Sequence, residues 1–283
     1  GNEDKIDSLA IFMFDATSKK LNNTFTSSDI QYADIPTGGM TATIEVTENV
    51  GSKVFFFVAN PALAADLDNI RFNVTEIDEF QETISDSLPG LPGDQGASLL
   101  MSGKTTVADV EGVTAAERKI GIRRRVARFD IDNMAVDPND PSNANGTNFT
   151  IKKILLENIN KQGYVFGDAT GNAGIPLKKS NIEVPFGDGP GHNEGRTESA
   201  FFTYPCTIEA GKAGISFEGE FNGETRTYSL VPSAGKLEIE PNMRYTLKAQ
   251  RLSVDSVTFA ITVEDWEDHG SELPAESEKE KLE

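Results

Sequence analysis

Four arginines stand within residues 123–128 of this acidic chain, whose formal net charge is −19. Guanidinium groups bind carboxylates and phosphates, and an exposed arginine run can also be a protease site. Residues 119–132, KIGIRRRVARFDID, read as a strand, which argues against exposed cleavage. Arg124 and Arg128 share one strand face with Asp130. We therefore expect these arginines to pair with carboxylates across strands or at a domain interface.

Other residues capable of chemistry are few. Cys206 is the lone cysteine, which excludes an intramolecular disulfide framework and a cysteine-rich metal site. His192 and His269 stand in polar surroundings and are interpreted as surface residues. Enzyme chemistry would need carboxylates, yet no Asp/Glu pair stands in the apolar setting that a glycosidase requires. The sequence therefore predicts a protein that is not an enzyme, with no catalytic residue, cofactor or metal.

Two loops have compositions that could hold ions. Asp137, Asn139, Asp140 and Asn143 offer oxygen ligands for calcium, but their spacing fits no EF-hand loop and a solvated turn is favoured. Residues 187–191, GDGPG, resemble a phosphate loop only in composition and open no helix. The acidic balance argues against nucleic acid as a partner, because phosphate neutralisation needs a basic surface.

The arginine strand changes its apolar face in the middle. Apolar side chains lie on the even-numbered face as far as Val126, and on the odd-numbered face from Ala127 onward. A bulge could produce this change, as could a strand that passes from one core to another. We interpret it as the junction of two domains. The predicted junction residues are Arg124, Val126, Ala127, Arg128 and Phe129.

Short strands separated by turn residues account for most of the remaining sequence. Residues 9–14 are apolar on both faces, as in a central strand, and residues 54–59 form a β-branched and aromatic run. Asn222-Gly223 between two alternating runs is the strongest hairpin signal. Helical spacing is confined to Val74, Ile77, Phe80 and Ile84, which predicts one short helix.

This pattern predicts an all-β fold of β-sandwiches with one or two short helices. The predicted division is an N-terminal sandwich at 1–124 and a C-terminal one at 125–266. Residues 163–195, rich in Gly, Asn and Asp, suit extended surface loops. Residues 267–283 are acidic, contain Pro274 and lack apolar alternation, so we expect a disordered tail.

An ordered set of landmarks resembles the fimbrillins, the fimbrial subunits of Bacteroidetes, over about residues 8 to 266. The landmarks are SLAIFMFDATSKKL (8–21), VFFFVANPA (54–62), LLMSG (99–103), RRRVARFDI (123–131), IKKILLENI (151–159), FFTYP (201–205), IEPNMRYTL (239–247) and FAITVEDW (259–266). Each is an ordinary strand with its turn, and the resemblance rests on their order and spacing.

The resemblance implies two tandem transthyretin-like β-sandwich domains and export to the outer membrane as a lipoprotein precursor, with membrane contact only through its lipid anchor. It further implies proteolysis after an arginine, removal of a first strand and polymerisation with other fimbrial subunits by strand addition. With the first strand starting near Ile6, we expect the removable strand to be missing already. Leu9, Ile11 and Met13 are the candidate floor of the assembly groove, or else plain closed core. Surface receptors or glycans are possible further partners.

Two alternatives stay open. The tail is a poor donor strand, so either residues 257–266 donate or the subunit is an accessory or tip one that accepts without donating, which we slightly favour. The rival function is a surface lipoprotein carbohydrate-binding module, in which Trp266 and Tyr204 could stack on a sugar, although a lone Trp that ends a strand more often caps a core.

Overall fold

Strands make up most of the computed structural model of this chain. It describes residues 5–34, 40–46, 51–64, 75–81, 83, 85, 98–108, 120–133, 149–166, 177–186, 195–221, 223–253 and 256–266. Within these ranges the helical elements are the short helix α1 (Ile77–Gln81) and the 3-10 turn η2 (Pro61–Leu63). The predicted all-β class with one or two short helices is confirmed. No helix in the described ranges is both long and apolar enough to cross a membrane.

The first half of the chain is built on a five-stranded antiparallel sheet with the strand order β2-β1-β5-β6-β7. Its strands are β1 (Leu9–Asp15), β2 (Leu21–Phe25), β5 (Lys53–Ala59), β6 (Met101–Val107) and β7 (Arg123–Arg124). A separate two-stranded sheet pairs β3 (Gln31–Asp34) with β4 (Met40–Thr43). We call β1 to β7 with α1 the N-terminal group.

Both faces of the five-stranded sheet are buried at its strands β1 and β5, which are apolar at residues 9–14 and 54–59. Phe12 and Phe56 point to one face, where they pack with Phe80 of α1. Ile11 and Phe57 point to the opposite face, in a second cluster that a half-buried Ala42 of β4 contacts. The alternation of side chains along a strand thus gives β1 and β5 two cores, as predicted from their composition.

The helix is shorter than the periodic pattern that predicted it. It covers five residues, with Asp78 and Glu79 in its first turn, where acidic groups favour the positive end of the helix dipole. Phe80 is fully buried, whereas Val74 and Ile84 lie outside the described residues. Packing of Phe80 and of the half-buried Ile77, with a 2.9 Å bond from the Ile77 N–H to the Lys19 carbonyl oxygen, positions the helix.

The second half of the chain contains two four-stranded sheets, with the orders β10-β9-β13-β14 and β11-β8-β16-β17. Their strands are β8 (Ala127–Asp132), β9 (Phe149–Asn160), β10 (Lys179–Pro185), β11 (Arg196–Thr203), β13 (Gly214–Phe221), β14 (Glu224–Ser229), β16 (Met243–Ser253) and β17 (Ser256–Asp265). A two-stranded sheet of β12 (Cys206–Glu209) and β15 (Lys236–Ile239) completes what we call the C-terminal group.

One large cluster fills the space between these two four-stranded sheets. The ring of Phe129 stacks on those of Phe201 and Tyr245, with centroids 4.5 and 5.0 Å apart. Phe217 of β13 stacks on Phe259 of β17 at 4.1 Å, which joins the two layers. The arrangement is a β-sandwich.

The predicted Asn-Gly hairpin is confirmed. Phe221 pairs with Glu224, so two residues connect β13 to β14. Gly223 has a φ of 82°, the positive value that such a tight turn requires.

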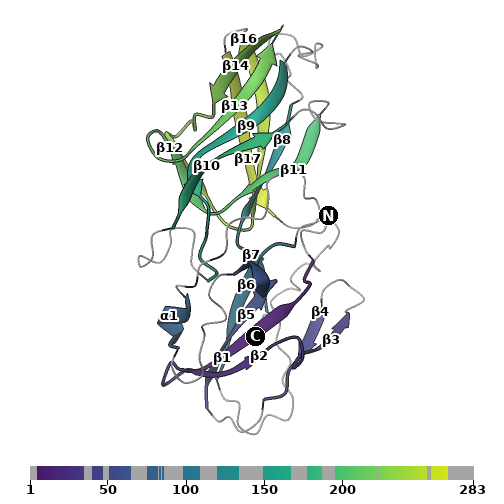
Figure 1. Ribbon diagram of the computed structural model, residues 1–283, viewed down its shortest axis with the longest axis vertical. Helices are drawn as coiled ribbons and strands as arrows, with labels where there is room; N and C mark the ends of the chain where they lie inside the picture. The colour runs from purple at the N-terminus through teal and green to yellow at the C-terminus, as the bar shows by residue number, and fades with distance from the viewer. Residues whose placement is uncertain are drawn as a thin grey trace, which may run out of the picture.

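The two groups of strands lie at opposite ends of an elongated molecule (Figure 1). β7 and β8 follow one another in sequence but belong to different sheets, one in each group. The chain therefore passes from one group to the other within the arginine-rich segment.

Candidate functional site

The chain crosses between the two groups at residues 124–127, and the other two predicted junction residues, Arg128 and Phe129, lie within β8. Arg124 ends β7 in the five-stranded sheet, and Ala127 begins β8 in a four-stranded sheet. Val126, between them, is buried in a small cluster of its own with Leu99, Tyr204 and Trp266. The change of apolar face comes from the passage between sheets rather than from a bulge within one strand.

Arg124 contacts Trp266, the residue that directly follows β17, which is the last strand in the described part of the chain. Its guanidinium carbon lies 4.4 Å from the centre of the Trp266 ring, and its Nη1 donates a 2.8 Å hydrogen bond to the Trp266 carbonyl oxygen. The amide oxygen of Asn242 accepts two further bonds of 3.3 Å, from the backbone N–H and Nη1 of Arg124. The Arg124 guanidinium thus binds two residues that are far from it in sequence, Asn242 at 118 positions and Trp266 at 142 positions.

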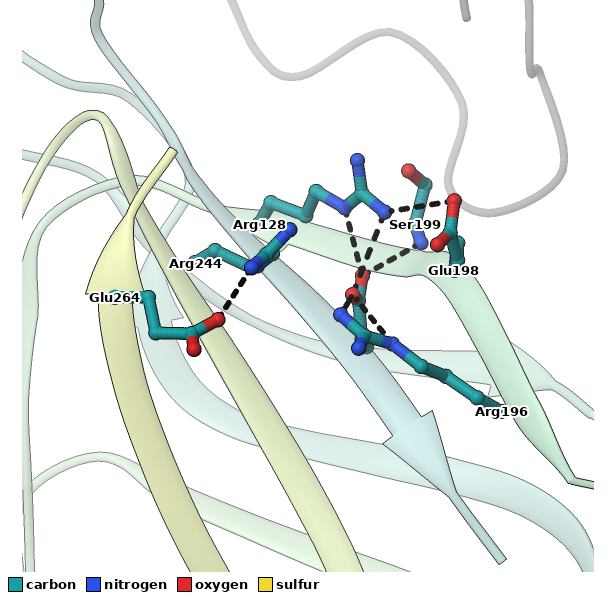
Figure 2. Close-up of polar contacts among 7 residues, drawn as sticks. Arg128, Arg196, Glu198, Ser199, Arg244 and Glu264 are labelled. Carbon is teal, nitrogen blue, oxygen red and sulfur yellow. Dashed lines mark hydrogen bonds and ion pairs between the residues drawn. The ribbon is translucent and has the colours of Figure 1, made fainter. Parts of the chain in front are cut away.

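Arg128 pairs with Asp130, and Asp130 is the centre of a buried polar network. Its carboxylate accepts a 2.7 Å bond from Arg128 Nε, a 2.5 Å bond from Arg196 Nη2 and a 2.9 Å bond from the backbone N–H of Ser199. Arg128 and Arg196 approach from two sides, and Glu198 reaches Arg128 from β11 at 3.3 Å (Figure 2). The predicted pairing of Arg128 with carboxylates is confirmed.

This network keeps the Asp130 carboxylate ionised. Complete burial opposes ionisation, but hydrogen bonds from Arg128, Arg196 and the Ser199 amide outweigh it and hold the pKa of Asp130 below its usual range. Ser199 has a φ of 52° within an irregular stretch of the β8–β11 pairing, so the carboxylate also fixes an unusual backbone conformation. A carboxylate that stays ionised in this way has no proton to donate and is a poor general acid. Its bonds to Arg196 and Ser199 instead hold β11 to β8.

A second ion pair, between Arg244 and Glu264, lies on the same sheet. Arg244 lies opposite Arg128 in the parallel pairing of β16 with β8, and it forms an ion pair with Glu264 of β17 (Figure 2). Arg244 is largely buried, whereas about half of the Glu264 side chain is exposed. Charge pairs therefore join β11 to β8 and, separately, β16 to β17 on one face of the sheet.

The candidate groove residues are covered in this structure. Leu9, Ile11 and Met13 are each at most 4% exposed and lie in the cluster on the odd-numbered face of β1. Half-buried side chains around them include Ile44 and Ile122. In this state the three residues form closed core.

A segment of the second half of the chain packs into the first half, which the sequence did not predict. Val165 is fully buried against the N-terminal group, and the Phe166 ring packs on Phe56 and Phe80 at 5.0 and 4.8 Å. Backbone hydrogen bonds join Ser85 to Gly163 at 2.8 Å and Val165 to Thr83 at 2.9 Å. Residues 163–166 are thus core and not the surface loop that their Gly-rich context suggested. The aromatic pair at 164 and 166 was the available signal.

Later in that range, Ile182 and Val184 belong to the strand β10, with Val184 fully buried. The Gly-rich range 163–195 therefore contains both a core segment and a strand.

The remaining candidates contribute no binding surface among the described residues. Trp266 and Tyr204 are only 1% and 2% exposed, so they cannot offer a platform to a sugar. Burial raises the pKa of the Cys206 thiol to about 12, which makes it a weak nucleophile. Both histidines, the calcium candidates at 137–143, the GDGPG loop and the acidic tail lie outside the described residues.

Comparison with known proteins shows which solved structures have a similar fold. No protein-family model matches the chain, and no curated protein matches it in sequence. The tip fimbrial protein Mfa3 from Porphyromonas gingivalis has a similar structure, with a TM-score of 0.58 at 15% identity over 93% of this chain and 95% of that one. A fimbrial assembly protein from Parabacteroides distasonis gives 0.60 at 14% identity over 92% and 91%. The chain has the fold of Bacteroidetes fimbrial proteins, as the landmarks predicted.

Proposed function

We propose that the protein is a subunit of a Bacteroidetes-type cell-surface fimbria, with a structural and adhesive role and no catalysis. The observation that carries this proposal is the fold match, which covers more than nine tenths of both this chain and the fimbrial proteins. Its partners are then other fimbrial subunits, and surface receptors or glycans. Its precursor reaches the outer membrane as a lipoprotein.

We further propose two domains that divide at the junction, 1–124 and 125–266. The hydrophobic clusters support this division, since the largest one draws on residues 127–261 while the two clusters of the five-stranded sheet draw mainly on residues 6–122. Residues 163–166 are an exception, because they belong to the second domain in sequence and to the first in packing.

The odd-numbered face of β1 is the proposed acceptor of a strand from another subunit. Leu9, Ile11 and Met13 lie there, and the sheet that accompanies the five-stranded one in the described residues has only two strands, β3 and β4. An added strand would bury apolar side chains on this floor and pair its backbone with a sheet edge. Assembly in this form requires the present cover to be displaced.

The last strand supports the accessory or tip position over the stalk. β17 is paired with β16 from Ser256 to Asp265, and Phe259 stacks inside the sandwich core. Donation of this strand would remove Phe259 and the fully buried Trp266 from their packing partners in this subunit, at a cost to its core of about 3 kcal/mol or more for each aromatic side chain. We therefore propose a subunit that accepts a strand without donating β17. Because both proposed sugar-platform residues are buried, no observation favours the carbohydrate-binding alternative.

Polymerisation of the full-length precursor after arginine-specific proteolysis tests this function. Ladders on unboiled gels are expected when the precursor is mixed with other subunits. Ile11→Ala is expected to shorten these ladders, because it removes apolar surface from the acceptor face. Val58→Ala, a truncation of a fully buried residue on the opposite face of the same sheet, is the matched control and is expected to leave them unchanged. A protein that stays monomeric throughout and binds soluble glycans would refute the proposal.

A further inference from the structure

Trp266 lies where the two groups of strands meet. It directly follows β17, is only 1% exposed and packs against Leu99, which precedes β6 of the N-terminal group. The Phe202 ring of β11 stacks on it at 5.6 Å with an interplanar angle of 13°. One side chain is therefore in contact with both groups.

Arg124 binds this tryptophan from the side of the N-terminal group. Through its backbone it belongs to the five-stranded sheet, where it pairs with Met101 of β6. Through its side chain it covers the Trp266 ring at 4.4 Å and donates to the Trp266 carbonyl oxygen. Arg124 is 8% exposed, and a cation–π contact is strongest where water is excluded.

Asn242 completes the connection through its backbone as well as its side chain. Its N–H donates a 2.9 Å bond to the Val126 carbonyl oxygen, and its own carbonyl oxygen accepts a 3.1 Å bond from the Trp266 N–H. Its left-handed φ of 60° suits the turn in which it lies. We call Arg124, Asn242 and Trp266 the clasp.

We infer that the clasp holds the last strand of the C-terminal group to the five-stranded sheet, so that the two groups unfold as one cooperative unit. Release of β17 must break the bond to Arg124 and leave a buried guanidinium without its aromatic and carbonyl partners. Local opening of either group is then unfavourable unless the other opens too. The inference concerns the chain by itself and does not depend on the proposed fimbrial role.

The chain contains one tryptophan, which makes the experiment specific. Trp266 fluorescence reports the clasp, while far-UV circular dichroism reports all the sheets. In urea, the two transitions of the wild-type protein are expected to coincide. In Arg124→Gln the fluorescence transition is expected to move to a lower urea concentration than the circular dichroism transition, because the clasp opens first.

Arg123→Gln is the matched control, since Arg123 is the exposed neighbour on the same strand β7. Its two transitions are expected to coincide as in the wild type. Coincident transitions in Arg124→Gln, with a midpoint shift no larger than that of Arg123→Gln, would overturn the inference.

Amide hydrogen exchange of the wild-type protein supplies a measurement that does not depend on a variant folding. If the clasp couples the groups, the slowest amides of β6 and of β17 exchange through the same opening, with protection factors that agree within about threefold. Protection factors that differ by about a hundredfold or more between these two strands would show independent opening and contradict the inference.

Discussion

The Asp130 carboxylate lies 2.7 Å from Nε of Arg128, two residues earlier on the same face of β8, and neither side chain is more than 8% exposed. Residues at this spacing on a strand usually point to solvent together when their face is not the sandwich core. Here Arg196 and the irregular stretch of β11 around Ser199 cover them. The pair therefore behaves as a buried polar element on the outer face of the sheet.

Removal of the Asp130 charge is expected to be strongly destabilising. Asp130→Asn should lower the free energy of unfolding by about 3–5 kcal/mol, because the buried Arg128 guanidinium would lose its buried counter-charge and keep only the exposed Glu198. Urea denaturation followed by circular dichroism measures the change. Glu198→Gln is the control, since this Arg128 partner is 68% exposed and should cost less than about 1 kcal/mol. Equal losses for the two variants would contradict this account of the network.

Protonation of Asp15 in acid is expected to lower the free energy of unfolding. A hydrogen bond from Lys53 Nζ, followed by one from the Ser18 amide, holds the pKa of Asp15 well below its usual range. A carboxyl group whose pKa is lower in the folded state stabilises the fold fully above its unfolded pKa of about 3.9, and this contribution is lost as the pH falls through the folded value.

The stability of the wild-type protein should therefore decrease between about pH 5 and pH 2. In Asp15→Asn the decrease should be smaller, because the group that titrates is gone. Urea midpoints recorded across this range provide the measurement. An unchanged pH dependence in the variant would mean that the Lys53–Asp15 pair, although 2.7 Å apart, contributes no pH-dependent stability.

The contact between Gly103 and Gly121 should tolerate substitution on one side only. A Cβ added at Gly103 would lie 2.5 Å from the backbone oxygen of Gly121, whereas one added at Gly121 meets no atom within 4 Å. Gly103→Ala is expected to destabilise by about 1–3 kcal/mol, because backbone must move to relieve the overlap. Gly121→Ala should be neutral or stabilise by a few tenths to about 1 kcal/mol. Thermal denaturation of both variants distinguishes the two positions, and a neutral Gly103→Ala would show that this approach is not tight.

Phe166 is expected to contribute to the stability of a group of strands far from its own part of the sequence. Phe166→Ala should destabilise by about 3 kcal/mol, because its ring packs on Phe56 and Phe80. Hydrogen exchange should then accelerate in β5 of the N-terminal group. Val263→Ala, at an exposed apolar residue of β17, is the comparison and should change little. If exchange increased only in the C-terminal group, Phe166 would not be part of the N-terminal core.

Strand identity was predictable because it depends on neighbours in sequence. The runs at 9–14 and 54–59 are apolar on both faces, and this determines that β1 and β5 lie in the centre of a sheet wherever that sheet is placed. The Asn222-Gly223 dipeptide determined its hairpin for the same reason, since a positive φ is a property of the residue itself.

The position of residues 163–166 was not predictable in this way. Their Gly-rich surroundings indicate a loop, and only the tertiary structure shows that Val165 and Phe166 fill a gap beside Phe80. The burial of Trp266 could likewise not be deduced, because its partners Arg124 and Phe202 come from distant parts of the chain.

The sequence by itself determined the central apolar strands, their alternation and the point near Val126 where the apolar face changes. These are consequences of side-chain chemistry at spacings of one and two residues. Only the tertiary structure decided what the arginines contact: Arg124 binds Trp266 and Asn242, and Arg128 binds Asp130 beside Arg196. The reason is that a guanidinium group accepts many partners, so its choice depends on which strand ends the fold brings within reach and shields from water.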